Sequence, residues 1–230
     1  MTRTRTLPER PGTPETEDDT GVYAPQADSL LLADTLRAAP PPPGAEVLDL
    51  GTGTGVLALT AAGYGARVTA VDVAGPAVTR ARRNAALVGL PVRVLRGDLF
   101  GPVAGRRFDL ILCNPPYVAA PDHALPEDGP ALAWDAGPDG RAVLDRVCAQ
   151  AGAHLRPGGS LLLVHSALSG PATTLDRLRR GGLAAEVVRR VRVPLGPVLR
   201  SRAAWLRAQG LLPPGDTTEG LVVVRAERTR

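Results

Sequence analysis

From Ala45 onward the chain alternates short apolar runs with longer amphipathic runs, and this alternation restricts the possible folds more than any other feature. Apolar runs separated by helical patterns are typical of parallel strands joined by crossover helices, with helices on both faces of the sheet. The sequence therefore predicts an α/β fold with a mostly parallel sheet. Seven strands are expected near residues 45–50, 67–72, 92–95, 108–113, 159–165, 184–193 and 220–226. Helices are expected over 55–63, 75–88, 139–154, 171–180 and 198–209.

The last expected strand has no helical crossover of its own after "LLPPGD", which permits an antiparallel strand inserted into the sheet. Residues 1–21 are rich in Pro, Thr and charge without periodicity, so we expect a disordered leader there. A single domain is expected over 22–230, because α/β domains commonly reach this size. It opens with a helix in "YAPQADSLLLADTLRAA", where Asp28 or Ser29 is expected to cap the first turn.

Composition narrows the class of protein. No apolar stretch approaches the roughly 20 residues that would span a bilayer, and no signal peptide is evident, so we expect a cytoplasmic protein. The two cysteines, Cys113 and Cys148, and the three histidines are too scattered for a metal site, and we expect none. All 27 basic residues are arginine, yet the net charge is only +4, which does not indicate nucleic-acid binding.

A glycine-rich loop separates the first expected strand and helix in "EVLDLGTGTGVLAL". Gly51, Gly53 and Gly55 allow a tight turn close to a ligand, and the next helix offers free N–H groups. The spacing is G-x-G-x-G, whereas the dinucleotide fingerprint is G-x-G-x-x-G. Asp49 beside the loop would repel a pyrophosphate and attract an ammonium group, so a cationic ligand fits better.

Two further acids follow the next strands. Asp72 ends "ARVTAVD", where a carboxylate can accept hydrogen bonds from both hydroxyls of a ribose. Asp98 in "RGDLF" follows the third strand and can accept from an adenine amine. Each acid alone also suits a turn or a helix cap. Three acids at successive strand ends indicate a nucleoside site.

This series resembles the class I S-adenosylmethionine-dependent methyltransferases. The resemblance implies a Rossmann-like seven-stranded sheet of order 3-2-1-4-5-7-6 with the last strand antiparallel. It also implies S-adenosylmethionine as the methyl donor and S-adenosylhomocysteine as the product. Asp49 and the loop from Gly51 to Gly55 would lie at the aminocarboxypropyl group, Asp72 with Val73 at the ribose, and Asp98 at the adenine.

The fourth expected strand runs directly into Asn114, Pro115, Pro116 and Tyr117. Consecutive prolines end a backbone ladder, because each lacks an N–H and has a fixed φ. An amide nitrogen is a poor nucleophile, since its lone pair is delocalised into the carbonyl. Asn114 offers a side-chain oxygen and Pro115 a backbone oxygen to the hydrogens of a planar NH2 group, and Tyr117 can stack on it. Both a glutamine amide and an exocyclic base amine are such groups.

Three segments resemble the HemK-type protein-(glutamine-N5) methyltransferases, closest to the branch that acts on release factors of eukaryotes and archaea. They are "VYAPQADSLLLADTL", "NPPYV" and "ALAWDAGPDGRAVLDRV". The resemblance implies methylation of the glutamine in a release factor's Gly-Gly-Gln loop, with Asn114, Pro115 and Tyr117 in the catalytic turn. Ser29 would lie by the donor's methionine moiety, and Asn114 would contact donor and substrate. Relatives in eukaryotes need a small activating subunit, which is a possible partner here.

Three alternatives stay open: an acceptor that is a peptide or small molecule, adenine-N6 methylation of nucleic acid, and a donor-binding subunit without catalysis. Residues 190–216 add a helix and loop that shorter relatives lack. Within the arginine-rich stretch 189–207, Leu199, Ala203 and Leu206 predict a covering helix whose arginines face solvent. A docking surface or lid formed by its arginines and Trp205 is the other interpretation.

Overall fold

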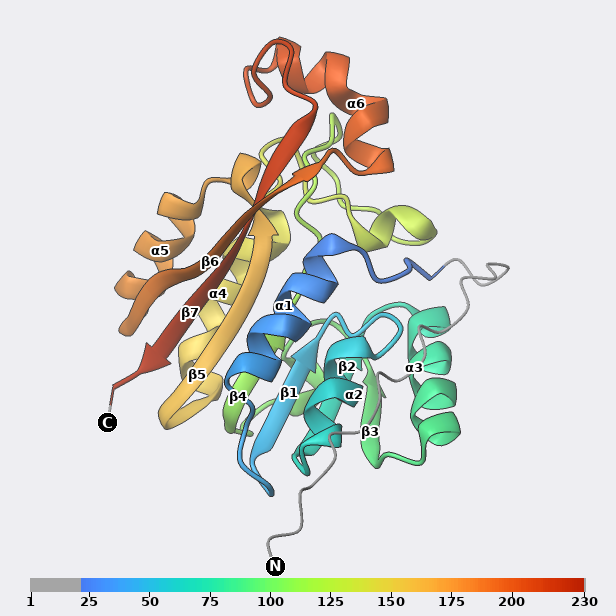
Figure 1. Cartoon of the computed structure of the whole chain (residues 1–230), viewed down its shortest axis with the longest axis vertical. Helices are drawn as coiled ribbons and strands as arrows, with labels where there is room; N and C mark the ends of the chain where they lie inside the picture. Colours follow the sequence, from blue (N-terminus) through green and yellow to red (C-terminus); the bar gives the residue numbers. More distant parts are fainter. Residues whose placement is uncertain (1–21, 230) are drawn as a thin grey trace, which may run out of the picture.

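The computed structural model describes residues 22–229 and contains one seven-stranded sheet of order β3-β2-β1-β4-β5-β7-β6 (Figure 1). Strand β7 is antiparallel to β5 and β6, and the other pairings are parallel, as predicted. The expected leader, 1–21, lies outside the described residues. The strands are β1 Glu46–Leu50, β2 Arg67–Asp72, β3 Val92–Arg96, β4 Phe108–Cys113, β5 Leu155–Ser166, β6 Leu183–Pro194 and β7 Thr218–Arg228.

The helices agree with the expected ones to within a few residues. They are α1 Ala27–Ala38, α2 Val56–Gly63, α3 Gly75–Val88, α4 Ala142–His154, α5 Pro171–Arg180 and α6 Pro197–Ala208, with 3-10 turns η1 Gly101–Val103, η2 Pro130–Ala133 and η3 Ala167–Ser169. Helix α4 starts three residues later than expected, because Gly137 and Gly140 adopt positive φ and form a turn before it. Among the helices described between residues 22 and 229, none is long and apolar enough to cross a membrane.

The predicted cap of the first helix is wrong in its position, although Asp28 Oδ1 does accept from an N–H of the first turn, that of Ser29, at 2.6 Å. Helix α1 begins at Ala27 with Gln26 as its N-cap, and no side chain caps it. Asp28 and Ser29 lie inside the first turn and are buried. Their side chains are used elsewhere, as described below for the site.

The sheet is covered on both faces, and neighbouring strand residues point into different cores. Leu110 and Leu112 of β4 pack with α1, α2 and α3, whereas Ile111 packs with α4 and α5 on the other face. Cys113 and Cys148 are unpaired and belong to this second core. Because both faces are filled, a ligand site has to lie at an edge or an end of the sheet.

Strands β6 and β7 extend beyond the rest of the sheet and carry α6 at their far end (Figure 1). We call residues 190–216, which include α6, the arm. Leu199 and Leu206 of α6 are buried in a third apolar cluster with Ala119, so the predicted covering helix is confirmed. Its arginines do not simply face solvent: Arg200 donates to the carbonyl of Leu195, and Arg207 to that of Asp216.

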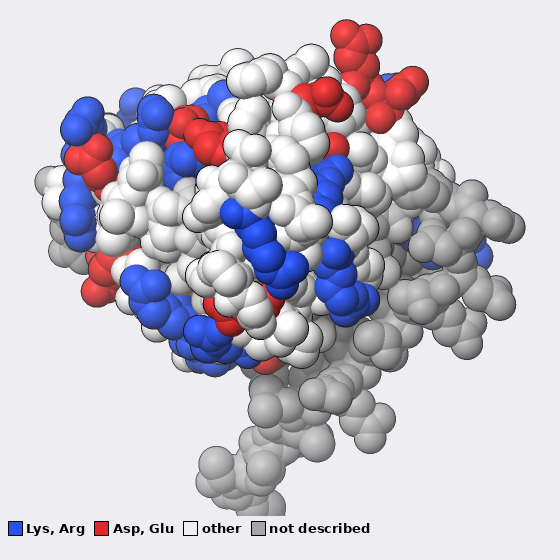
Figure 2. Space-filling view, turned by 90° about the horizontal axis from the view of Figure 1, so that it is seen from above, with Lys and Arg blue, Asp and Glu red and all other residues white. Residues whose placement is uncertain are grey.

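Seen from the arm end, basic side chains lie in separate groups among acidic and uncharged residues (Figure 2). No continuous basic field covers the visible described surface in this view. Such a field is what binding to a phosphate backbone requires.

Candidate functional site

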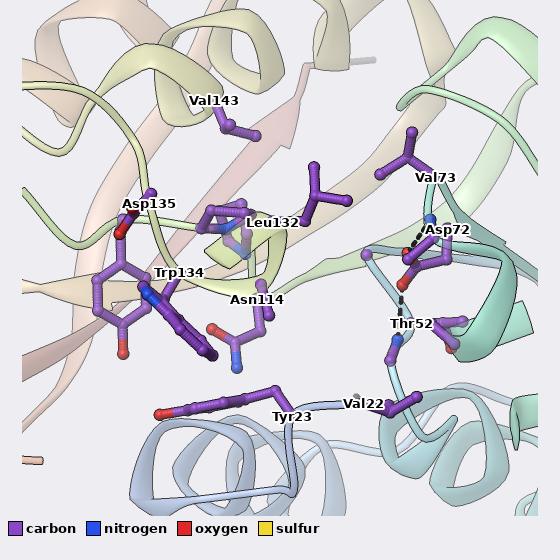
Figure 3. A pocket seen from close by; sticks show the side chains of 18 of the residues that line it. Val22, Tyr23, Thr52, Asp72, Val73, Asn114, Leu132, Trp134, Asp135 and Val143 are labelled. Carbon is purple, nitrogen blue, oxygen red and sulfur yellow. Dashed lines mark hydrogen bonds between the residues drawn. The ribbon is translucent and has the colours of Figure 1, made fainter. Parts of the chain in front are cut away.

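A cavity of about 290 Å³ opens where β1, β2 and β4 end (Figure 3). Nearly all the site residues predicted from the sequence line it, although they come from separate parts of the chain. They are Ser29, Gly51, Gly53, Asp72, Val73, Asp98, Asn114, Pro115 and Tyr117. The cavity thus lies at the carboxyl ends of parallel strands, where open α/β sheets bind their ligands.

The glycine-loop end of the cavity is formed by Gly51, Gly53, Asp72 and Val73. Gly51 and Gly53 have φ values of 68° and 53°, which a side chain would strain. The N–H of Gly53 donates to Asp72 Oδ2 at 2.8 Å, and the N–H of Ala74 donates to Oδ1 at 2.9 Å. Burial raises the pKa of Asp72, and these N–H groups oppose the rise. The carboxylate is therefore held in one orientation at the end of β2.

Asp49 and Gly55 are not among the residues that line the cavity. Asp49 is fully buried, and its Oδ2 accepts from Thr52 Oγ1 at 2.6 Å and from the N–H of Ala58 at 3.0 Å. Burial raises its pKa to about 7. Asp49 thus braces the loop from behind, and Gly55 caps α2 where a Cβ would lie 3.4 Å from that of Ala81. Asp49 Oδ1 has no hydrogen-bond partner among the described residues, and its contact with a ligand stays a prediction.

Beyond Asp72 the cavity wall becomes apolar and then charged. Val73 lines the cavity and keeps 47% of its surface exposed, so a flat ring could lie against it. Asp98 lies farther along and forms an ion pair with Arg146 of α4. Arg146 also lines the cavity, and nothing in the sequence pattern pointed to it.

The NPPY turn, residues 114–117, is tied to helix α1 by two side-chain hydrogen bonds. Asn114 Nδ2 donates to Ser29 Oγ at 3.0 Å, and the hydroxyl of Tyr117 donates to Asp28 Oδ2 at 2.7 Å. Burial and the neighbouring Asp28 carboxylate raise the pKa of Tyr117 well above its usual value, so its O–H stays a donor. The bond to Ser29 orients the Asn114 amide so that Oδ1 is the free atom.

Asn114 Oδ1 is buried and has no hydrogen-bond partner among the described residues. A buried oxygen without a donor is costly, which marks it as an atom that a ligand's N–H group satisfies. Tyr23 and Trp134 lie beside it (Figure 3), with ring centroids 5.6 Å apart and planes inclined by 55°. We call the part of the cavity lined by Tyr23, Asn114 and Trp134 the NPPY end.

Sequence reasoning missed Tyr23 and Trp134 as site residues. Neither belongs to a helix or strand, and the sequence interpretation expected the stacking ring to be Tyr117. The structure instead ties the hydroxyl of Tyr117 to Asp28 and places Tyr23 and Trp134 next to Asn114. A usable signal was present, because both aromatics lie within the two segments that carry the resemblance and only 3% of the chain is aromatic.

The residues present fit S-adenosylmethionine. A fixed carboxylate at Asp72 suits the hydroxyls of a ribose, exposed Val73 suits an adenine ring, and the loop at Gly51 and Gly53 leaves backbone close to the ligand. The unpartnered Asn114 Oδ1 faces the opposite end, where an acceptor would enter. The two ends of one cavity therefore carry groups that suit a donor and an acceptor.

Comparisons with known proteins agree with this description. Residues 18–126 match the family described as "Methyltransferase small domain". A Methanocaldococcus jannaschii protein named "Putative protein N5-glutamine methyltransferase" is 34% identical over 174 residues, which are 75% of this chain and 86% of that protein. The release factor glutamine methyltransferase of Deinococcus radiodurans is 40% identical over 185 residues, 78% of this chain and 62% of the relative. The chain thus spans less than two thirds of the bacterial enzyme's length.

Among solved structures, the Mtq2–Trm112 complex of E. cuniculi, described as responsible for methylation of the eRF1 translation termination factor, has a similar fold. The TM-score is 0.65 with 22% sequence identity, and the alignment covers 91% of this chain and 99% of that one. At this identity the likeness establishes the fold alone.

Proposed function

Because the chain belongs to the protein N5-glutamine methyltransferases, an S-adenosylmethionine-dependent family, we propose that it methylates the side-chain amide of a glutamine in the Gly-Gly-Gln motif of a translation release factor. The observation that carries the proposal is the orphan Oδ1 of Asn114, whose amide is oriented by Ser29 and lies beside the rings of Tyr23 and Trp134. A planar primary amide supplies the N–H group that this oxygen lacks and the flat face that the rings can contact.

At the glycine-loop end, Asp72, Val73, Gly51 and Gly53 would hold the donor, with Asp98 at the adenine. S-adenosylmethionine supplies an electrophilic methyl group and leaves as S-adenosylhomocysteine. Ser29 links the two ends, because its hydroxyl lines the cavity and also accepts from Asn114 Nδ2. This arrangement supports in-line approach of an acceptor nitrogen to the methyl group.

At the NPPY end, Asn114 Oδ1 and the carbonyl of Pro115 would accept hydrogen bonds from the two amide hydrogens. These two hydrogen bonds would polarise the N–H bonds, which increases the negative charge on the nitrogen, and they would fix the plane of the amide. The nitrogen would form a bond to the methyl carbon as the bond from that carbon to the donor's sulfur breaks, and one amide proton would pass to solvent water. Tyr117 contributes by anchoring the turn to Asp28.

The shape of the cavity favours a macromolecular acceptor over a small molecule. A buried small-molecule site would use the arm as a wall, but none of residues 190–216, all within the described part of the chain, lines the cavity. The acceptor is therefore expected to enter as a protruding loop, which matches a glutamine at the tip of a release factor.

Charge at the cavity favours a protein loop over a nucleic acid. Four acidic residues line it: Asp28, Asp72, Asp98 and Asp135. Arg146, the one arginine of the lining, is paired with Asp98, and Arg202, which lies outside the lining, is paired with Asp135. Such a lining repels a phosphate backbone. A cytoplasmic location and a small activating subunit belong to the same proposal, the latter because the similar E. cuniculi protein is in a complex with Trm112.

The proposal is tested with the full chain, labelled S-adenosylmethionine and a class I release factor. A matched factor carrying asparagine in place of the Gly-Gly-Gln glutamine serves as control. We expect label on the natural factor only, and mass spectrometry should place one added methyl group on that glutamine. Label on another protein, on a nucleic acid or on a small molecule, with none on the glutamine, would overturn the proposal.

A further inference from the structure

The arm reaches the NPPY end through one side chain, Arg202 of α6. Its Nη1 donates to the carboxylate of Asp135 at 2.5 Å and to the carbonyl of Ala119 at 3.2 Å. Asp135 immediately follows Trp134, and Ala119 lies two residues after the NPPY turn. The two side chains of this ion pair are 22% and 16% exposed, so water screens it less than it would a surface pair.

The two segments that Arg202 contacts also pair with each other. The N–H of Val118 donates to the carbonyl of Trp134 at 2.7 Å, and the N–H of Ala136 donates to the carbonyl of Val118 at 3.0 Å. Trp134 is therefore attached, by its own backbone, to the chain that leaves the NPPY turn. Arg202 bridges the same two segments from outside, so one guanidinium fixes their spacing.

Helix α6 is itself anchored, which gives Arg202 a fixed base. Leu199 and Leu206 are 4% and 0% exposed and pack with Leu195, Leu212 and Ala119 in the third apolar cluster. Trp205 packs against the same cluster. Since Ala119 belongs to both the cluster and the exit from the NPPY turn, the arm and the NPPY end are joined by one packed cluster.

We infer that Arg202 is a positioning residue for the acceptor: by bridging Asp135 and Ala119, it holds Trp134 as a wall of the NPPY end, and the arm thereby sets which acceptor loops fit. The acceptor part of this inference rests on the proposed function. The position of Trp134 does not, and it can be measured separately. Arg202 lies outside the set of residues that line the cavity, so it acts through Trp134 and not by contact.

The position of Trp134 is tested by fluorescence. The chain has two tryptophans, so a Trp205→Phe background leaves Trp134 as the single emitter. In that background Arg202→Met should raise the acrylamide quenching constant of Trp134 about twofold or more, because the loop loses its outer bridge. Arg200→Met is the matched control, since Arg200 lies on the same helix and its side chain donates only to the carbonyl of Leu195 among the hydrogen bonds described.

Steady-state kinetics test the effect on the acceptor. Arg202→Met should raise the acceptor KM about five- to tenfold, with donor affinity within twofold of the parent. The reason is that a displaced Trp134 weakens binding of the acceptor and leaves the donor site unchanged. Arg202→Lys should recover part of the loss by keeping the charge opposite Asp135. Adding Asp135→Asn to Arg202→Met should cost little more, since both changes remove the same contact. A merely structural role would instead lower the active fraction and the melting temperature and leave KM unchanged.

Unchanged quenching and unchanged acceptor KM in Arg202→Met would overturn the inference. An equal effect of Arg200→Met would also overturn it, because the arm would then act through its general stability. If the parent chain methylates no glutamine, the proposed function fails, and the quenching experiment still decides whether Arg202 positions Trp134.

Discussion

The two ends of the cavity are built in different ways. The glycine-loop end comes from the tips of two adjacent strands, where Asp72 and Gly53 are fixed by main-chain hydrogen bonds. The NPPY end is assembled from three distant segments that carry Tyr23, Asn114 and Trp134, and side-chain contacts join them in addition to the main-chain pairing of Trp134 with Val118. One end is a property of the sheet, and the other is a property of the loops and of the arm.

The donor site is thus a feature of the fold, whereas the acceptor site is a feature of the particular family. A sheet edge with a glycine loop and a strand-end acid suits one nucleoside donor whatever the acceptor is. Acceptor choice depends on loops, because loops can change without disturbing the core. Substitutions at the two ends should therefore affect different measured quantities.

The largest effect is expected from Asn114→Ala at the NPPY end. Removing the orphan acceptor should lower the rate of methyl transfer by about 10²- to 10³-fold, the usual loss for one preorganised group at the reacting centre. Donor affinity, measured by calorimetry, should stay within about threefold, since the glycine-loop end is untouched. Gln150→Ala, which removes an amide on α4 outside the cavity lining, should keep full activity. Equal losses of rate and donor affinity would contradict the assignment of separate donor and acceptor roles to the two ends.

The opposite pattern is expected from Asp72→Ala. Loss of the carboxylate should weaken donor binding about 10- to 100-fold, because charged hydrogen bonds to two hydroxyls are lost together. The rate at saturating donor should fall far less. Asp34→Ala removes an exposed acid of α1, paired with Arg37, and controls for the change in net charge. A fall in the saturated rate with unchanged donor affinity would contradict the assignment of Asp72 to the donor.

Ser29→Ala tests the link between the two ends, and a smaller effect of about tenfold on the rate is expected. Without the hydroxyl, Asn114 Nδ2 loses its acceptor and the amide can rotate, so Oδ1 is no longer held toward the acceptor. Ser29→Thr keeps the hydroxyl and should restore most of the activity. If Ser29→Ala lowers donor affinity by the same factor as the rate, Ser29 serves the donor alone.

The glycine-loop end could be predicted from the sequence because its signals are local. Once the strands are recognised, glycines that follow an apolar run and acids at successive strand ends can be assigned to the carboxyl-terminal edge of the sheet. The NPPY end could be predicted only in its centre, where two prolines after a strand mark the turn. Tyr23, Trp134 and Arg202 meet through tertiary contacts, and no sequence period connects them.

The Asp28–Ser29 pair shows why local reasoning failed at this point. Short polar side chains before an apolar helix are typical N-caps, so a cap was the natural interpretation. The same side chains can accept hydrogen bonds from a distant segment, and burial against the NPPY turn decides between the two uses. Burial of this kind depends on the whole fold and is not readable from the local pattern. The expected division into a leader and one domain also stays a prediction, since residues 1–21 lie outside the described part.

The smallest effect concerns stability and comes from Glu219, a buried acid on β7 beside the NPPY end. Burial, with the nearby carboxylate of Asp28, raises its pKa to about 7, although hydrogen bonds from Ser166 and from the N–H of Gly196 oppose the rise. Its Oε2 has no partner among the described residues. Burial, and after it the carboxylates of Asp28 and Glu219, raise the pKa of Tyr23 to about 12 and that of Tyr117 well above its usual value, so these four groups form one acidic cluster at the NPPY end.

The direction of the pH effect follows from proton binding. Between the usual value of 4.5 and about 7, the folded state holds a proton on Glu219 that the unfolded chain has released. The stabilisation from this group is therefore fully present below pH 4.5 and is lost as pH rises through about 7. Buried Asp49, with its pKa of about 7, acts in the same direction, whereas His165, whose pKa burial lowers to about 4, acts in the opposite one. Asp49 and His165 are unchanged in a Glu219 variant, so their contributions cancel in the difference in unfolding free energy between parent and variant.

Glu219→Gln mimics the protonated side chain and should remove this dependence. We expect the variant to match the parent near pH 5 and to exceed its free energy of unfolding by about 1–3 kcal/mol at pH 8, since one pKa unit is worth about 1.4 kcal/mol. Urea unfolding at several pH values measures the difference, and Glu227→Gln on the same strand reports the effect of removing a less buried carboxylate. Parallel profiles for parent and Glu219→Gln would show that Glu219 is ionised at neutral pH.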